Sequence, residues 1–138
     1  MQYLTPRYFL LIGGAVLLAL GIIGFINSFA SLVPDNKIFY LDTGENVAHT
    51  VLGVVALLLA TQMKEQASLL KTVVVLVGLI ALFFGLYGFI LVPGDTMHPN
   101  AFGLGNLESP LDNLLHLVVA AWAFASAFVK AAPMAKSA

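Results

Sequence analysis

Four long stretches of the chain contain no charged residue, and they constrain its fold more than any other feature. They cover residues 8–34, 46–63, 72–94 and 113–129. A helix needs about 17–25 apolar residues to cross a bilayer, and only helices and closed barrels satisfy every backbone polar group there. Leu, Val, Ala and Phe follow one another without the period of two that a membrane strand requires. The sequence therefore predicts spanning helices over about residues 8–30, 45–63, 70–92 and 111–130.

The composition agrees with this fold and excludes several other classes of protein. Charged residues make up 9% of the chain, against about 25% in an ordinary soluble domain, and 60% of the residues are hydrophobic. The net charge of −1 excludes a nucleic-acid-binding protein that relies on a basic surface. The absence of cysteine excludes disulfides, thiolate metal sites and thiol redox chemistry. We expect an all-α protein, with one transmembrane domain over residues 1–138 that lies in the lipid bilayer.

The few charged residues predict an orientation in the membrane. Five of the six basic residues fall on one side of the four-span arrangement, namely Arg7, Lys64, Lys71, Lys130 and Lys136. Loops rich in Lys and Arg stay in the cytoplasm, so both termini and the short turn after the second span are predicted to be cytoplasmic. Six of the seven acidic residues fall on the opposite, outer side, and only Glu65 does not.

The chain contains two related copies of a helical hairpin. The first span carries Gly14, Gly21, Gly24, Phe25 and Ile26, and the third carries Gly78, Gly85, Gly88, Phe89 and Ile90 with the same spacing, 64 residues later. The second and fourth spans begin with related blocks that end in Asn46-x-x-His49 and Asn113-x-x-His116, 67 residues apart. We interpret the chain as a tandem parallel repeat with halves over about residues 8–66 and 70–132. Its pseudo-two-fold axis would run along the membrane normal.

The repeated glycines have a direct physical interpretation as helix-packing residues. Small residues let helix backbones approach closely, and dispersion then holds the helices together where no hydrophobic effect operates. The six predicted packing positions are Gly14, Gly21, Gly24, Gly78, Gly85 and Gly88.

Each predicted outer helix start combines a capping signature with a polar face. Asp42-x-x-Glu45 and Ser109-x-x-Asp112 resemble the capping box, with Pro110 at the predicted first helical position. His49 and His116 lie seven residues beyond these caps, at or just below the hydrocarbon boundary, where a polar side chain is costly unless it is paired. Asn46 and Asn113 share a face with them at the i, i+3 spacing.

Three interpretations of this polar face remain open. In the first, the imidazoles and amides bond across helices or to the outer loops and hold the hairpins together without a ligand. In the second, His49, His116, Glu45 and Asp112 bind zinc or another divalent metal, with His98 as a further ligand. In the third, His49 and His116 are the two axial ligands of a haem between facing helices. A pH-sensing or ligand-sensing role for the same histidines is a further alternative.

Three motifs carry a resemblance to a known family. They are Gly14, Gly21, Gly24 and Phe25 in the first span, Asn46-x-x-His49-x-x-x-Gly53 in the second, and Asp112-Asn113-x-Leu115-His116-Leu117 in the fourth. Together they resemble a bacterial family of small four-span membrane proteins of unknown function (domain of unknown function forty-three eighty-three). One departure is Ala120, where the second motif would carry a glycine like Gly53. The resemblance implies four helices in a bacterial inner membrane, and it supplies no reaction.

The sequence favours a protein without catalytic activity. No Asp, Glu, Lys or Arg lies deep in any span, and no catalytic motif stands out. We expect a structural or accessory protein that associates with itself or with a larger membrane complex, with no nucleic-acid partner. The alternatives are a haem-binding or metal-binding module at the outer face, and a small permeation or sensing protein.

Overall fold

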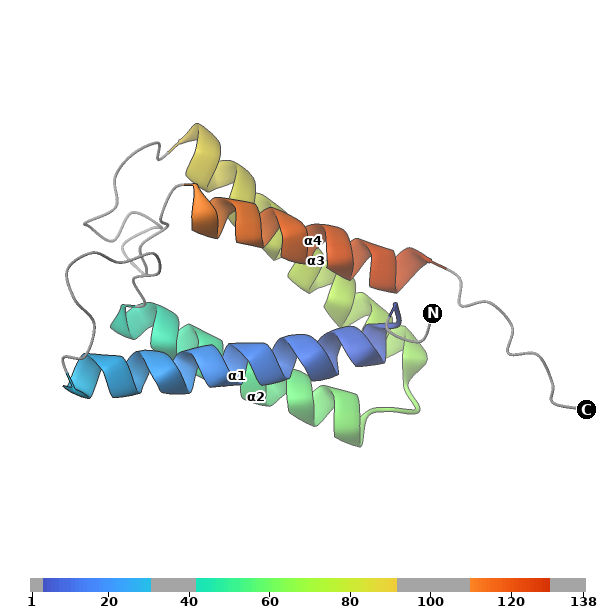
Figure 1. Ribbon diagram of the computed structural model, residues 1–138. Coiled ribbons are helices and arrows are strands. Elements are labelled where there is room, and N and C mark those ends of the chain that lie inside the picture. The colour runs from blue at the N-terminus through green and yellow to red at the C-terminus, as the bar shows by residue number, and fades with distance from the viewer. Residues whose placement is uncertain (1–3, 31–41, 92–109, 130–138) are drawn as a thin grey trace, which may run out of the picture.

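The computed structural model describes residues 4–30, 42–91 and 110–129. These residues form four helices and no strand: α1 (Pro6–Ala30), α2 (Thr43–Gln62), α3 (Ala67–Ile90) and α4 (Leu111–Phe128) (Figure 1). All four are long and apolar enough to cross a membrane. The prediction of an all-α, four-helix membrane bundle is therefore confirmed. The largest difference from a predicted boundary is three residues, at the start of α3, which begins at 67 instead of 70.

The helices are arranged as two hairpins. α1 packs along α2 and α3 packs along α4, and these two pairs account for most of the contacts between helices (Figure 1). We call the end of the bundle with the start of α1, the α2–α3 turn and the end of α4 the turn end. The opposite end, where α2 and α4 begin, is the loop end.

The apolar core lies at the turn end and draws on all four helices. Its buried members are Phe9, Leu10, Ala60, Leu70, Val74, Ala123 and Ala127. The ring of Phe9 meets that of Trp122 edge-on, with the ring centroids 4.6 Å apart. α1 contacts both α3 and α4 and so connects the hairpins. The hairpins diverge from this core toward the loop end (Figure 1).

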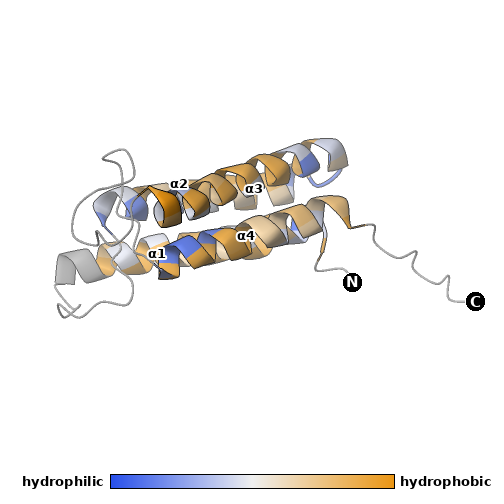
Figure 2. Ribbon diagram, turned by 90° about the horizontal axis from the view of Figure 1, so that it is seen from above, coloured by the Kyte–Doolittle hydropathy of each residue, from blue (hydrophilic) through white to orange (hydrophobic). Residues whose placement is uncertain are grey.

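Most of the helical surface is apolar and lies outside this core. Only 17–28% of the residues in the apolar window of each span are buried within the bundle. Large side chains such as Ile80 and Val118 remain 57% exposed. The middle of each helix is hydrophobic, and hydrophilic residues gather at the helix ends (Figure 2). Because a soluble protein of this size rarely exposes so large an apolar surface, the molecule is suited to lipid.

The capping box predicted for α2 is present. The backbone N–H of Glu45 donates to Asp42 Oδ1 over 2.8 Å, and the N–H of Asp42 donates to Glu45 Oε2 over 2.9 Å. This reciprocal pair satisfies two backbone donors that a helix start otherwise leaves unpaired. The box therefore fixes the residue at which α2 begins and the positions of the following residues along the helix axis.

α4 begins at residue 111, as predicted for the fourth span, but the role of Pro110 differs from the prediction. Pro110 was predicted as the first helical residue, but it occupies the N-cap and makes no side-chain cap hydrogen bond. Its carbonyl accepts the N–H of Leu114 over 3.0 Å, as an N-cap carbonyl does. A proline side chain has no acceptor atom to complete a capping box. Ser109, the predicted cap, lies outside the described residues.

Candidate functional site

Two completely buried asparagines, one in each hairpin, join the two helices of that hairpin near the loop end. Asn46 of α2 and Asn113 of α4 are both 0% exposed, although each carries a polar amide. The side chain of Asn46 lies against Gly24 of α1, and that of Asn113 lies against Gly88 of α3. A β-carbon added to either glycine would overlap the amide oxygen of its asparagine. Only glycine therefore fits opposite each asparagine.

The same geometry determines which atoms of each asparagine and glycine meet. The amide oxygen occupies the place of the missing β-carbon, and so it lies next to the glycine Cα–H. Contacts between a Cα–H and an oxygen recur where helices approach closely and are worth roughly 0.5–1 kcal/mol each. Each asparagine thus joins two helices through polar contact without introducing a charge into the apolar span.

The close contacts continue along both hairpins at matching positions. A β-carbon on Gly21 would meet Thr50 and the Asn46 carbonyl, and one on Gly14 would meet Ala56 and Leu57. In the second hairpin, a β-carbon on Gly85 would meet Leu117 and the Asn113 carbonyl, and one on Gly78 would meet Ala123 and Phe124. We call each line of contacts a hairpin seam. All six glycines predicted to pack helices lie in these two seams.

One difference between the two seams is that α4 carries Ala120 where α2 carries Gly53, and the spacing of the helices accommodates it. A β-carbon on Gly53 would lie 2.6 Å from the Leu18 backbone nitrogen and 2.8 Å from the Gly14 carbonyl oxygen. Ala120, the equivalent residue in α4, is accommodated with 2% exposure. α1 and α2 therefore approach more closely at this point than α3 and α4 do, and the second seam has room for a methyl group.

The two histidines lie beside the asparagines and are only partly buried. His116 Nδ1 is 2.8 Å from the backbone oxygen of Asp112, one turn earlier in α4. A neutral ring that donates through Nδ1 keeps the lone pair of Nε2 for another partner. His49 is close enough to His116, Asp112 and Asp42 for electrostatic interaction, so α2 and α4 bring both imidazoles to the same end of the bundle.

The predicted metal ligands do not assemble into one cluster. The Glu45 carboxylate accepts the Asp42 N–H in the capping box. Within residues 4–30, 42–91 and 110–129, no group of three or more His, Asp or Glu side chains is placed to hold a metal ion. His98 lies outside this part of the chain. The described residues therefore supply two imidazoles, but they do not bring Glu45, His49, Asp112 and His116 together.

Several buried polar atoms at this site have no hydrogen-bond partner among the described residues. They are both amide atoms of Asn113 and Nδ1 of His49. An unsatisfied buried polar atom costs about 1–3 kcal/mol. The predicted bonds to the outer loops would involve residues 31–41 and 92–109, which lie outside the description. The unpaired atoms of Asn113 and His49 therefore lie together near the loop end.

The pairing of each asparagine with its glycine was not predicted from the sequence. Both residue types were recognised as repeated, but not as partners. One signal was available: Gly24 and Asn46 are 22 residues apart, whereas Gly88 and Asn113 are 25 apart. The three-residue difference equals the difference between the two repeat offsets, 64 and 67, as expected when one contact is kept across loops of unequal length.

Four apolar helices of spanning length, with a polar site near one end, define a small multi-pass membrane protein. The sequence model of the family described as Domain of unknown function (DUF4383) matches residues 7–129, and the chain belongs to this family. None of the curated proteins and none of the solved structures compared with the chain matches it.

Proposed function

We propose that this protein has a structural or accessory role without catalysis, and that it associates with copies of itself or with a larger membrane complex. The observation that carries the proposal is the apolar surface left outside the bundle, since at most 28% of the residues in each spanning window are buried. The hairpin seams hold the two helices of each hairpin together through small residues and leave the large apolar side chains outward. Such faces suit lipid and the helices of other membrane proteins equally well.

Isolation of the protein from its native membranes in a mild detergent tests this proposal. We expect it to migrate with a mass well above the 14.7 kDa of one chain after correction for bound detergent. Chemical cross-linking in intact membranes should give the same partners as the purified complex. A monomer without a co-purifying protein, both in the detergent and after cross-linking, would contradict the proposal.

We also propose that the two hairpins are tandem repeats in a bacterial inner membrane, with the turn end facing the cytoplasm. The matching seams support the repeat, and the positions of Arg7, Lys64 and Lys71 at the turn end support the orientation. The chain has no cysteine, so single cysteines at Thr43 and Gln66 can be labelled separately. In intact spheroplasts, a membrane-impermeant maleimide should label Thr43→Cys and spare Gln66→Cys. The reverse pattern would place the turn end outside.

A haem-binding or metal-binding role is a second candidate, and the ring of His116 favours it. Its Nδ1 contact with the Asp112 carbonyl orients the imidazole and leaves Nε2 available, as in many histidine ligands of metals. The absorption spectrum and elemental content of the purified protein test this role. A Soret band or a stoichiometric metal should disappear in both His49→Ala and His116→Ala. Folded, colourless and metal-free protein would refute it.

A further inference from the structure

A cavity of about 160 Å³ opens at the turn end, between the start of α1 and the α2–α3 turn. Its lining residues are Thr5, Pro6, Arg7, Lys64, Ala67 and Leu70. A cavity needs a volume of only about 10–15 Å³ to hold one water molecule. This one therefore has room for a group of several atoms.

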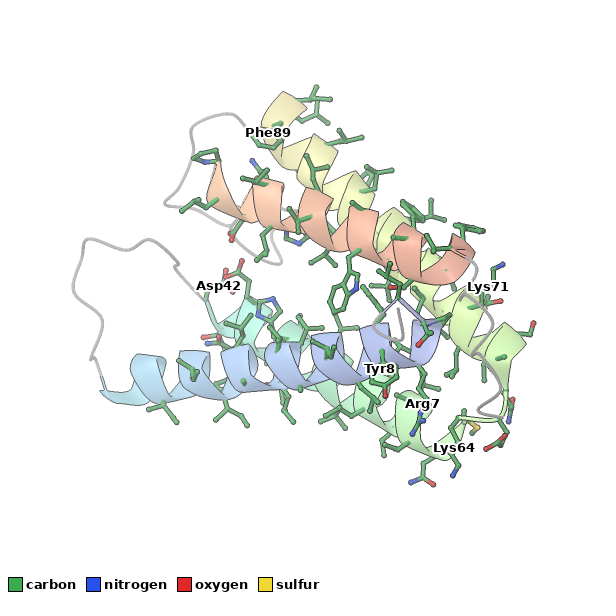
Figure 3. All side chains as sticks on the ribbon, turned by 45° about the vertical axis from the view of Figure 1, so that its right-hand side comes forward. Arg7, Tyr8, Asp42, Lys64, Lys71 and Phe89 are labelled. Carbon is green, nitrogen blue, oxygen red and sulfur yellow. The ribbon has the colours of Figure 1, made fainter. Side chains whose placement is uncertain are left out.

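Two cations line this turn-end cavity, and one of them is held in place. Arg7 Nε donates to the carbonyl oxygen of Ala60 over 3.2 Å, which fixes the guanidinium beside the end of α2. Both Nη groups remain for another acceptor, in the fork geometry that matches a phosphate or a carboxylate. Lys64, from the α2–α3 turn, also lines the cavity, and Figure 3 shows it near Arg7 at the turn end. Neither cation pairs with a carboxylate within the described segments.

The start of α3 adds to the positive potential of the cavity. Ala67 is the first residue of α3 and also lines the cavity. The N-cap residue Gln66 makes no side-chain cap hydrogen bond, and the first turn of α3 contains no acidic residue. No acidic residue within α3 therefore neutralises the positive end of the helix dipole, and Glu65, which precedes the N-cap, does not line the cavity. Together with the two side chains, the helix dipole favours an anion in the cavity.

The remaining lining residues and the position of the cavity identify the kind of anion. Pro6 and Leu70 add apolar side chains to the lining, and the cavity lies where α1 enters the apolar span. An anion bound there would contact Arg7 and Lys64 and would also lie beside apolar side chains and the apolar span of α1. We propose that the turn-end cavity binds the phosphate-bearing headgroup of an anionic phospholipid. Basic pockets between spanning helices are suited to such headgroups.

Lys71 provides a matched control for this proposal. It is also a cation at the turn end, but it does not line the cavity. Its Nζ lies 4.9 Å from the centre of the Phe128 ring, above the face of the aromatic system. Lys64→Gln, Arg7→Gln and Lys71→Gln each remove one positive charge from the same end of the protein, and only the first two remove it from the lining of the cavity.

The test uses the full chain, delipidated in a neutral detergent and titrated with phosphatidylglycerol or phosphatidylcholine, with native mass spectrometry as the readout. We expect one phosphatidylglycerol per chain and no comparable phosphatidylcholine adduct. Arg7→Gln and Lys64→Gln should each weaken binding about tenfold through loss of a charge-assisted hydrogen bond. Lys71→Gln should change it by less than about twofold, because the Lys71 charge lies outside the cavity and is screened by the ions of the solution.

Two results would overturn the proposal. Equal weakening in all three variants would show a response to net charge alone. Displacement of the lipid by millimolar inorganic phosphate would assign the cavity to a soluble phosphate instead of a lipid. Arg7→Gln also removes the bond to Ala60, so its unfolding curve is compared with that of the unaltered protein. Lys64 is exposed, and Lys64→Gln therefore keeps the test valid if Arg7→Gln loses stability.

Discussion

At the scale of single residues, the contact between a buried asparagine and a glycine is the feature that most restricts the sequence. Asn46 and Asn113 fill the space that a β-carbon would take on Gly24 and Gly88. An amide is short enough to fit there and polar enough to interact across the seam. Any larger residue in place of either glycine would push α1 from α2, or α3 from α4.

Gly24→Ala and Gly88→Ala should each destabilise the bundle by about 1–3 kcal/mol, because the new methyl group would occupy the position of an amide oxygen. Gly13→Ala is the control, since a β-carbon there would lie 4.0 Å from the Trp122 ring, an ordinary contact. Unfolding in mixed micelles with increasing dodecyl sulfate, followed by circular dichroism, measures the difference. If the three variants unfold together, the seam does not depend on glycine at these positions.

A double substitution tests whether the two residues act as one contact. Asn113→Ala removes the amide that Gly88→Ala would strike, so the double variant should lose less stability than the sum of the two single losses. We expect a coupling of about 1 kcal/mol in the double-mutant cycle. The combination of Gly88→Ala with Asn46→Ala, from the other hairpin, should be additive. Coupling of equal size in both combinations would refute the direct contact.

The sequence could identify these residues but not their pairing. The spacing of Gly14, Gly21 and Gly24 marks one face of a helix, and the two Asn-x-x-His blocks stand out in apolar surroundings. Which asparagine meets which glycine depends on the relative rotation and height of two helices. Hydropathy does not encode those quantities when nearly every face is apolar.

At the scale of the helices, the two hairpins begin their second helix in different ways. The start of α2 is fixed by a complete capping box, whereas α4 begins after Pro110 with no side-chain cap. The helix ends were predictable to within three residues because charges and prolines mark the ends of the apolar runs. Pro110 was predicted as the first helical residue, but it is the N-cap. These two positions differ only in backbone angles that the sequence does not specify.

Asp42→Ala should loosen the first turn of α2 by about 1 kcal/mol, because the Glu45 N–H loses its acceptor and the Glu45 carboxylate loses its place in the box. Hydrogen exchange at the Glu45 N–H should accelerate about fivefold, and exchange in the middle of α2 should not change. Thr43→Ala, at the neighbouring exposed position, serves as the control. An unchanged exchange rate at Glu45 would show that the box contributes no protection.

At the scale of the whole molecule, the two hairpins are joined mainly at one end. The core that unites them lies at the turn end and includes the edge-on contact of Phe9 with Trp122. Four spans were predictable from the hydropathy and the charges. The divergence of the hairpins toward the loop end was not, because the faces that meet and the faces that separate have the same apolar composition.

Phe9→Ala should weaken the union of the hairpins by about 3 kcal/mol through the cavity that it leaves in the core. Trp122 is the single tryptophan of the chain, so its near-ultraviolet circular dichroism reports this contact directly. We expect the signal to fall markedly in Phe9→Ala. Phe89→Ala, a partly exposed position near the loop end, should leave it unchanged (Figure 3). A normal signal in Phe9→Ala would place the union of the hairpins elsewhere.

The placement of the seams has a consequence for how the protein is made. Each seam joins two helices that follow one another in the chain, and neither needs a residue from the other half. Because synthesis proceeds from the N-terminus, α1 acquires its partner as soon as α2 leaves the ribosome. Each hairpin therefore has all the residues of its seam once its own two helices have been made. No helix depends on a distant segment of the chain to complete its seam.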